Sequence, residues 1–150
     1  MKEKLNCVLL IDDDAATNVY NTAIVKSADI TDRIEVRDSG QKALEFLSSL
    51  EDGAHPSPAL IFLDVNMPGM DGWEFLEEYH KLAEEQKAKV VVFMLTTSLD
   101  PNDELKSTEM GASGFIRKPL TPELVQEIAS SRFSTSNSLK RSFLAETRLT

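Results

Sequence analysis

Carboxylates, a hydroxyl and a lysine directly follow four short apolar runs in this sequence. Asp12–Asp14 follow CVLLI, Asp64 follows ALIFL, Thr96 follows KVVVFML, and Arg117 and Lys118 follow GFI. Clustered carboxylates raise one another's pKa unless a cation compensates, and oxygen ligands suit Mg²⁺. A carboxylate such as Asp64 can attack phosphorus, and positive charge then stabilises the transferring group. Together these residue types predict a magnesium-dependent site that accepts a phosphoryl group.

Each of these groups also has a simpler structural explanation. Asp12–Asp14 can cap the N-terminus of a helix, although one aspartate suffices for that and three repel one another. Asp64 can form a turn, Thr96 can supply a turn hydroxyl, and Lys118 can be a solvated surface residue. The conjunction of these groups at four strand ends is what favours a functional site.

The rest of the sequence predicts five strands that alternate with five helices. Near-continuous apolar runs are typical of parallel strands that are covered on both faces. Capping residues mark the helix starts: Asp71 stands three residues before Glu74, and Asp100 and Thr121 each precede a proline. Five successive βα units favour an α/β fold with a doubly wound parallel sheet. The expected strands are residues 7–11, 34–37, 59–63, 89–95 and 114–116, and the expected helices are 15–28, 39–50, 71–87, 101–111 and 121–131.

The composition excludes several classes of protein. The 150 residues, 41% of them hydrophobic, suit one domain with its own core. A net charge of −9 provides no positive field for phosphates, so we expect no nucleic-acid binding. The single cysteine excludes a disulfide framework, and no apolar run approaches the roughly 20 residues of a membrane span. We therefore expect a cytoplasmic protein without membrane contact.

Four segments, in order and at suitable spacing, resemble the receiver domains of two-component response regulators. They are VLLIDDD, LIFLDVNMPGMDG, MLTTS and FIRKPL, and the resemblance extends from Lys4 to Arg132. It implies the flavodoxin-like form of the doubly wound sheet, with five parallel strands in the order 2-1-3-4-5 and five helices. It also implies a receiver domain over residues 4–132, followed by a C-terminal extension over 133–150.

The resemblance implies a metal site and a phosphoacceptor. Asp12 and Asp13 correspond to the acidic pair that holds Mg²⁺ (or Mn²⁺). Asp64 corresponds to the phosphoacceptor, which also contacts the metal. Asn66 corresponds to the position whose backbone carbonyl completes the metal site. Asp14 is a third acid that we do not expect to bind the metal.

The resemblance also implies a lysine partner for the phosphate and a conformational switch. Lys118 corresponds to the lysine that pairs with the phosphate, and Pro119 to a proline that follows a cis peptide bond. Thr96 corresponds to the switch hydroxyl, which also acts in catalysis, and Phe115 to the aromatic switch. Because Phe115 has no hydroxyl, its movement is expected to be driven by packing.

These roles imply a stand-alone, single-domain response regulator. It would accept a phosphoryl group from a histidine kinase or histidine phosphotransfer protein and signal by a phosphorylation-dependent change of its protein-binding surface. It would be no enzyme beyond its own Mg²⁺-dependent phosphorylation and dephosphorylation. A phosphate shuttle in a multistep phosphorelay, a phosphorylation-independent interaction module and an activation-linked dimer stay open as alternatives. A phosphohydrolase is disfavoured because Asn66 stands where that class has an acid, and Asp12–Asp14 would repel the phosphate of a nucleotide or flavin.

The end of the chain differs in composition from the rest. Residues 131–150 hold four basic residues, one acid and eight Ser or Thr. This composition favours an extended last helix or a flexible tail. The alternative is that Leu139, Phe143 and Leu144 form an apolar helical stripe that docks on the domain or on a downstream protein target.

Overall fold

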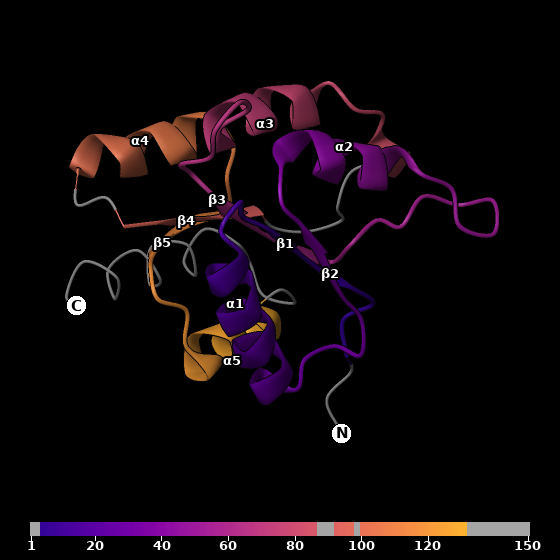
Figure 1. The fold of residues 1–150 in the computed structure, drawn as a ribbon, viewed down its shortest axis with the longest axis horizontal. Coiled ribbons are helices and arrows are strands. Elements are labelled where there is room, and N and C mark those ends of the chain that lie inside the picture. Colours follow the sequence, from indigo (N-terminus) through magenta and orange to yellow (C-terminus); the bar gives the residue numbers. More distant parts are fainter. Residues whose placement is uncertain (1–3, 87–91, 98–99, 132–150) are drawn as a thin grey trace.

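Figure 1 shows a central sheet between two layers of helices. The computed structural model describes residues 4–86, 92–97 and 100–131. All neighbouring strands are parallel and their order is β2-β1-β3-β4-β5, which confirms the predicted doubly wound sheet. The strands are β1 (Val8–Ile11), β2 (Ile34–Arg37), β3 (Leu60–Asp64), β4 (Val92–Thr96) and β5 (Gly114–Arg117).

Five α-helices cover the two faces of the sheet, as the sequence predicts. Two of them lie together on one face and three lie on the other (Figure 1). This arrangement explains why both faces of the strands are apolar. The first pair is α1 (Ala15–Ala28) and α5 (Pro122–Ser131), and the other three are α2 (Gly40–Ser48), α3 (Gly72–His80) and α4 (Pro101–Glu109).

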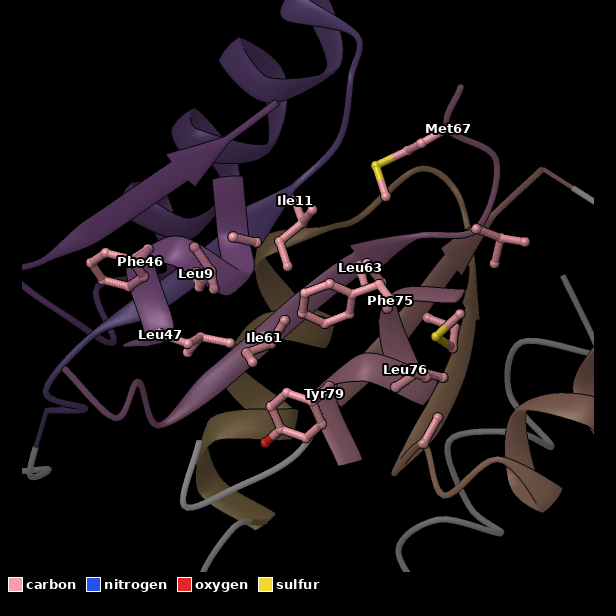
Figure 2. Packing of buried hydrophobic residues seen from close by; sticks show 14 of the residues in the cluster. Leu9, Ile11, Phe46, Leu47, Ile61, Leu63, Met67, Phe75, Leu76 and Tyr79 are labelled. Carbon is pink, nitrogen blue, oxygen red and sulfur yellow. The ribbon is translucent and has the colours of Figure 1, made fainter. Parts of the chain in front are cut away.

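Alternate residues of each central strand enter two separate hydrophobic clusters. In β3, Ile61 and Leu63 pack with Phe75 of α3 (Figure 2), whereas Phe62 belongs to the cluster beneath α1 and α5. All five residues of β3 are buried, including Asp64 at its last position. The side-chain alternation of a strand therefore fixes β3 on both faces and makes it a rigid support for that carboxylate.

The predicted helix starts are confirmed by their hydrogen bonds. Asp71 and Glu74 form a reciprocal capping box at the start of α3. Asp100 accepts a bond from the backbone of Asn102, and Thr121 accepts one from the backbone of Leu124. These caps satisfy donors that a helix N-terminus leaves without partners.

The prediction that the third helix reaches residue 87 is wrong. Helix α3 ends at His80, and the next backbone bonds run from Lys81 to Glu78 and from Leu82 to Tyr79, which tightens the last turn. Leu82 packs partly against the core, and the chain then forms a short 3₁₀ turn, η1 (Glu84–Gln86). The beginning of the predicted fourth strand, residues 89–91, lies outside the described residues.

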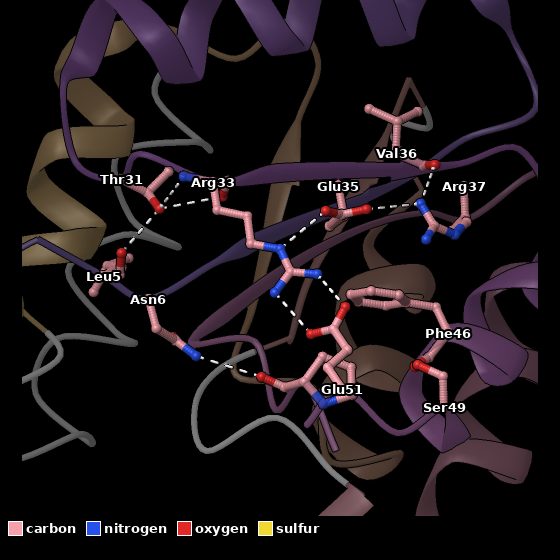
Figure 3. A network of polar contacts seen from close by, with 11 residues as sticks. Leu5, Asn6, Thr31, Arg33, Glu35, Val36, Arg37, Phe46, Ser49 and Glu51 are labelled. Carbon is pink, nitrogen blue, oxygen red and sulfur yellow. Dashed lines mark hydrogen bonds and ion pairs between the residues drawn. The ribbon is translucent and has the colours of Figure 1, made fainter. Parts of the chain in front are cut away.

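A network of charged side chains lines β2, an edge strand of the sheet (Figure 3). Arg33 donates two bonds of 2.8 and 2.6 Å to the carboxylate of Glu51 and one of 2.9 Å to Glu35. Arg37 donates to Glu35 at 3.1 Å, and its guanidinium lies 4.5 Å from the ring centroid of Phe46. We call these five residues the β2 network; it ties the segment after α2 to the sheet edge.

In the described residues, no helix has both the length and the hydrophobicity to cross a membrane. The predictions for residues 133–150, including the apolar stripe of Leu139, Phe143 and Leu144, lie outside the described part of the chain.

Candidate functional site

The register of the sheet brings the predicted strand ends together. Ile11 of β1 pairs with Leu63 of β3, so the residues that follow them, Asp12 and Asp64, lie at the same level. Asp64 pairs with Leu95, and Thr96 pairs with Arg117 of β5. The parallel arrangement therefore gathers side chains from β1, β3, β4 and β5 at the carboxyl ends of the strands, where open α/β sheets bind ligands.

Three carboxylates form a tight acidic cluster at these strand ends. One oxygen from each of Asp12, Asp13 and Asp64 lies within 4.8 Å of the other two. Asp12 and Asp64 are buried, with 3% and 5% of their surface exposed, whereas Asp13 is exposed. The inner part of the site, with Asp12 and Asp64, is thus buried, and the side with Asp13 is exposed to solvent.

Lys118 bridges the two buried carboxylates. Its Nζ lies 3.0 Å from Oδ2 of Asp12 and 2.9 Å from Oδ1 of Asp64. Burial opposes the charge on Lys118, but its hydrogen bonds to Asp64 and Asp12 outweigh that effect and raise its pKa above the usual value. Lys118 is therefore a fixed positive charge at neutral pH.

The contact with Lys118 does not fully neutralise the negative charge around Asp64. Burial raises its pKa above the ordinary 3.8, and the charges of Asp12 and Asp13 act in the same direction. The hydrogen bond from Lys118 offsets part of this effect. The cluster holds three carboxylates, and the Lys118 ammonium contacts two of them, so it keeps an excess of negative charge that a divalent cation can neutralise.

The residues present fit a bound Mg²⁺ or Mn²⁺. The donors are hard carboxylate oxygens that lie close enough together to bind one ion. Asp13 is exposed, so water molecules can supply further ligands on that side. Receiver domains generally bind Mg²⁺ through an acidic pocket of this kind. Asn66, whose carbonyl is the predicted fourth protein ligand, is exposed two residues beyond Asp64.

The turn after β3 is shaped by two glycines. Gly69 has a φ of 74°, which strongly favours glycine. Gly72 packs so closely that an added Cβ would lie 2.6 Å from the carbonyl oxygen of Asp64 and 2.9 Å from Cα of Val65. The backbone N–H of Gly72 also donates to the Val65 carbonyl at 2.8 Å. The start of α3 is therefore held directly against the strand end that carries Asp64.

The predicted switch residues lie on β4 and β5. Thr96 is buried, and its carbonyl accepts a 2.7 Å hydrogen bond from the backbone N–H of Lys118. Phe115 is buried in the cluster that also contains Met94. The peptide bond between Lys118 and Pro119 is cis, as the resemblance implies.

The three consecutive aspartates have different structural functions. Asp14 caps α1: one carboxylate oxygen accepts bonds of 2.8 and 2.6 Å from the backbone and hydroxyl of Thr17, and these bonds lower its pKa. Its own backbone N–H donates to Asp12 at 3.0 Å. The capping explanation therefore holds for Asp14, whereas Asp12 and Asp13 face the candidate site.

Sequence reasoning missed two residues of α1 that support this site. Asn18 donates from Nδ2 to the backbone carbonyl of Asp12 at 2.8 Å, and Tyr20 donates from its hydroxyl to the carbonyl of Leu120 at 2.8 Å. A signal for Asn18 exists, because Asn18 and Asn21 are polar residues on the buried face of a helix and need partners. Tyr20 has no such signal, since its partner lies 100 residues away in the chain.

Comparisons with known proteins agree with one another. The family model for the response regulator receiver domain matches residues 8–130. The two-component response regulator ORR5 of Oryza sativa subsp. japonica is 30% identical over 124 residues, which cover 82% of this chain and 85% of that protein. ORR7 of Oryza sativa subsp. indica is longer, and the match spans 53% of its length.

Solved structures show the same similarity. The crystal structure of a two component response regulator from Cytophaga hutchinsonii is 30% identical, has a TM-score of 0.73, and the match covers 87% of this chain and 97% of that one. The Mn(2+)-bound form of response regulator Rcp1 is 28% identical with a TM-score of 0.67, and the match covers 87% and 96% of the two chains.

Proposed function

The chain belongs to the response regulator receiver domain family, and from this premise we propose that it accepts a phosphoryl group on Asp64 from a histidine kinase or histidine phosphotransfer protein. Receiver domains interact with proteins of both kinds. The observation that carries the proposal is the environment of Asp64: a buried carboxylate with two further aspartates beside it and the Lys118 ammonium at 2.9 Å.

In the proposed reaction, a carboxylate oxygen of Asp64 forms a bond to the phosphorus of a phosphohistidine. The phosphorus–nitrogen bond breaks, and its electron pair stays on the imidazole nitrogen of the donor protein. The Lys118 ammonium lies 2.9 Å from Oδ1 of Asp64 and would stabilise the negative charge that develops on the phosphoryl oxygens. The rigid position of Asp64 at the end of β3 limits the motion that would misalign the attack.

Asp12, Asp13, Asp64 and the backbone carbonyl of Asn66 are the residues that would hold Mg²⁺. When bound, this ion supplies the positive charge that lowers the repulsion between the carboxylates and an incoming phosphoryl group. Lys118 alone cannot do so, because both buried carboxylates already share its charge.

We further propose that phosphorylation changes the surface formed by α4, β5 and α5. The Thr96 hydroxyl would move toward the phosphoryl oxygens, and Phe115 would fill the space that it leaves. Both residues are buried in neighbouring strands, and Phe115 pairs with Met94, two residues before Thr96. We therefore expect a movement of Thr96 to change the packing around Phe115. The altered surface would then bind a downstream protein, and a phosphate shuttle would use the same Asp64 chemistry in the reverse direction.

Intact-protein mass spectrometry after incubation with acetyl phosphate tests this proposal. We expect one added phosphoryl group in the wild type with Mg²⁺, and none in Asp64→Asn or in the wild type with EDTA. Asp14→Asn is the matched control, because the same acid-to-amide change lies two residues from Asp12 and asparagine is an equally good helix cap. We expect this control to be labelled like the wild type.

Labelling that persists in Asp64→Asn would place the phosphoryl group elsewhere and contradict the proposal. An unlabelled wild type, beside a receiver that is labelled under the same conditions, would instead favour a phosphorylation-independent interaction module. Side-chain NMR of the phosphorylated protein tests the proposed movement of Phe115, because an unchanged Phe115 ring signal would contradict it.

A further inference from the structure

We infer that Tyr20 of α1 is a positioning residue for Lys118, an inference that rests on the proposed phosphoryl transfer to Asp64. The Tyr20 hydroxyl donates a 2.8 Å hydrogen bond to the carbonyl of Leu120, two residues beyond Lys118. This bond connects α1 to the turn between β5 and α5. Helices α1 and α5 lie side by side, so the contact is supported on both sides.

The turn that carries Lys118 is fixed at three points. The backbone N–H of Lys118 donates to the carbonyl of Thr96 at 2.7 Å, which fixes its beginning against β4. The side chain of Leu120 is fully buried in the cluster beneath α1 and α5, which fixes its end. The hydrogen bond from Tyr20 then sets the orientation of the Leu120 peptide group, which packing of the side chain alone does not determine.

Helix α1 also positions Asp12, one of the two carboxylates that contact the Lys118 ammonium. Asn18 donates from Nδ2 to the backbone carbonyl of Asp12, and the Asp12 carboxylate lies 3.0 Å from Nζ of Lys118. One helix therefore positions both the turn that carries the cation and the turn that carries its carboxylate. A displacement of either turn changes the distance between the two charges, on which their interaction depends.

The high exposure of Tyr20 indicates that the hydrogen bond of its hydroxyl contributes more to the structure than the packing of its ring. The residue is 43% exposed, whereas Tyr79, the other tyrosine, is 6% exposed and packs in the hydrophobic core. Val19, the neighbour of Tyr20 on α1, is 72% exposed. Tyr20→Phe therefore removes the hydrogen bond with little change of packing, and Val19→Ala is a control on the same helix.

Two measurements on the full chain test the inference. The first is the rate of phosphorylation by acetyl phosphate as a function of Mg²⁺ concentration. Tyr20→Phe is expected to lower the maximal rate constant by roughly three- to tenfold, because a misplaced Lys118 stabilises the transition state less well. The Mg²⁺ concentration at half-maximal rate should stay within about twofold, since the carboxylates remain in place. Val19→Ala should match the wild type in both quantities.

The second measurement is the ¹³Cε NMR signal of Lys118 in lysine-labelled protein, assigned with Lys118→Arg. We expect this signal to shift in Tyr20→Phe and to stay unchanged in Val19→Ala. An unchanged Lys118 signal, an unchanged maximal rate, or an equal loss of rate and Mg²⁺ affinity would each overturn the inference. If the wild type itself is not phosphorylated, the proposed function fails, and the NMR signal still decides whether Tyr20 positions Lys118.

Discussion

The acidic site and the β2 network are both clusters of charged side chains, but they balance their charges differently. In the β2 network, Arg33 and Arg37 face Glu35 and Glu51, so the formal charges cancel, and the side chains of Arg33 and Glu51 are 38% and 42% exposed. In the acidic site, one lysine contacts two of three clustered carboxylates, and the side chains of Asp12 and Asp64 are 4% and 7% exposed.

The pKa directions follow from this difference. The hydrogen bonds from Arg33 lower the pKa of Glu51, as expected for a carboxylate in a neutral, solvated pair. The pKa of Asp64 is raised, because burial and two neighbouring acids outweigh the contact with Lys118. A charge imbalance at a buried position costs stability, and proteins retain such positions mainly where function requires them. The comparison thus separates a charge-balanced, exposed cluster from a buried one with excess negative charge, which is the kind of site that binds a cation.

The largest expected effect that distinguishes the two clusters is the response to Mg²⁺. At a concentration of about 100 times the Kd, Mg²⁺ should stabilise the wild type by about 2.7 kcal/mol. Asp13→Asn should lose most of this gain, since it removes an exposed ligand without disturbing the core. Urea unfolding with and without Mg²⁺ measures the effect.

Glu51→Gln is the matched control for this measurement, because it makes the same acid-to-amide change in the β2 network. It should keep the full response to Mg²⁺. A similar loss of the response in both variants would show that Mg²⁺ acts by general screening and that the two clusters do not differ in this respect.

A smaller effect is expected in the pH dependence of stability without metal. Because the pKa of Asp64 is raised, the folded protein binds this proton more tightly than the unfolded chain does. The contribution of Asp64 to stability should therefore decrease as the pH rises above 3.8, the ordinary pKa of this group. Asp64→Asn does not titrate, so in EDTA its stability relative to the wild type should rise between pH 4 and pH 7. A stability difference that stays constant between pH 4 and pH 7 would contradict the raised pKa.

The smallest expected effect is the opposite pH dependence in the β2 network. The pKa of Glu51 is lowered, so its ion pair with Arg33 contributes stability above pH 4.5 that is lost as the pH falls through the folded-state pKa. Glu51→Gln should lower the thermal midpoint at pH 7 by only a degree or two, roughly, because exposed ion pairs contribute little. The difference from the wild type should vanish on acidification; a difference that grows instead would show that Glu51 stabilises the fold by another route.

The sequence by itself determined the fold class and most of the candidate site. Near-continuous apolar runs such as LIFL identify buried parallel strands, and the carboxyl ends of parallel strands share one edge. That rule alone brings Asp12, Asp64 and Lys118 to the same place. The cap at Asp71 was equally predictable, because a capping box depends on residues only three positions apart.

Only the tertiary structure decided how these groups share their charges and which side chains hold them. Lys118 contacts Asp12 across 106 residues of sequence, and Tyr20 contacts Leu120 across 100. Such distances depend on sheet register and on the packing of α1 against α5, and neither is encoded in a local pattern. The end of α3 at His80 also departs from the local helical pattern, since tertiary context can override helix propensity. Periodicity and capping act within a few residues and can be read along the chain, whereas the balance of charge at Asp64 arises only when distant strands meet.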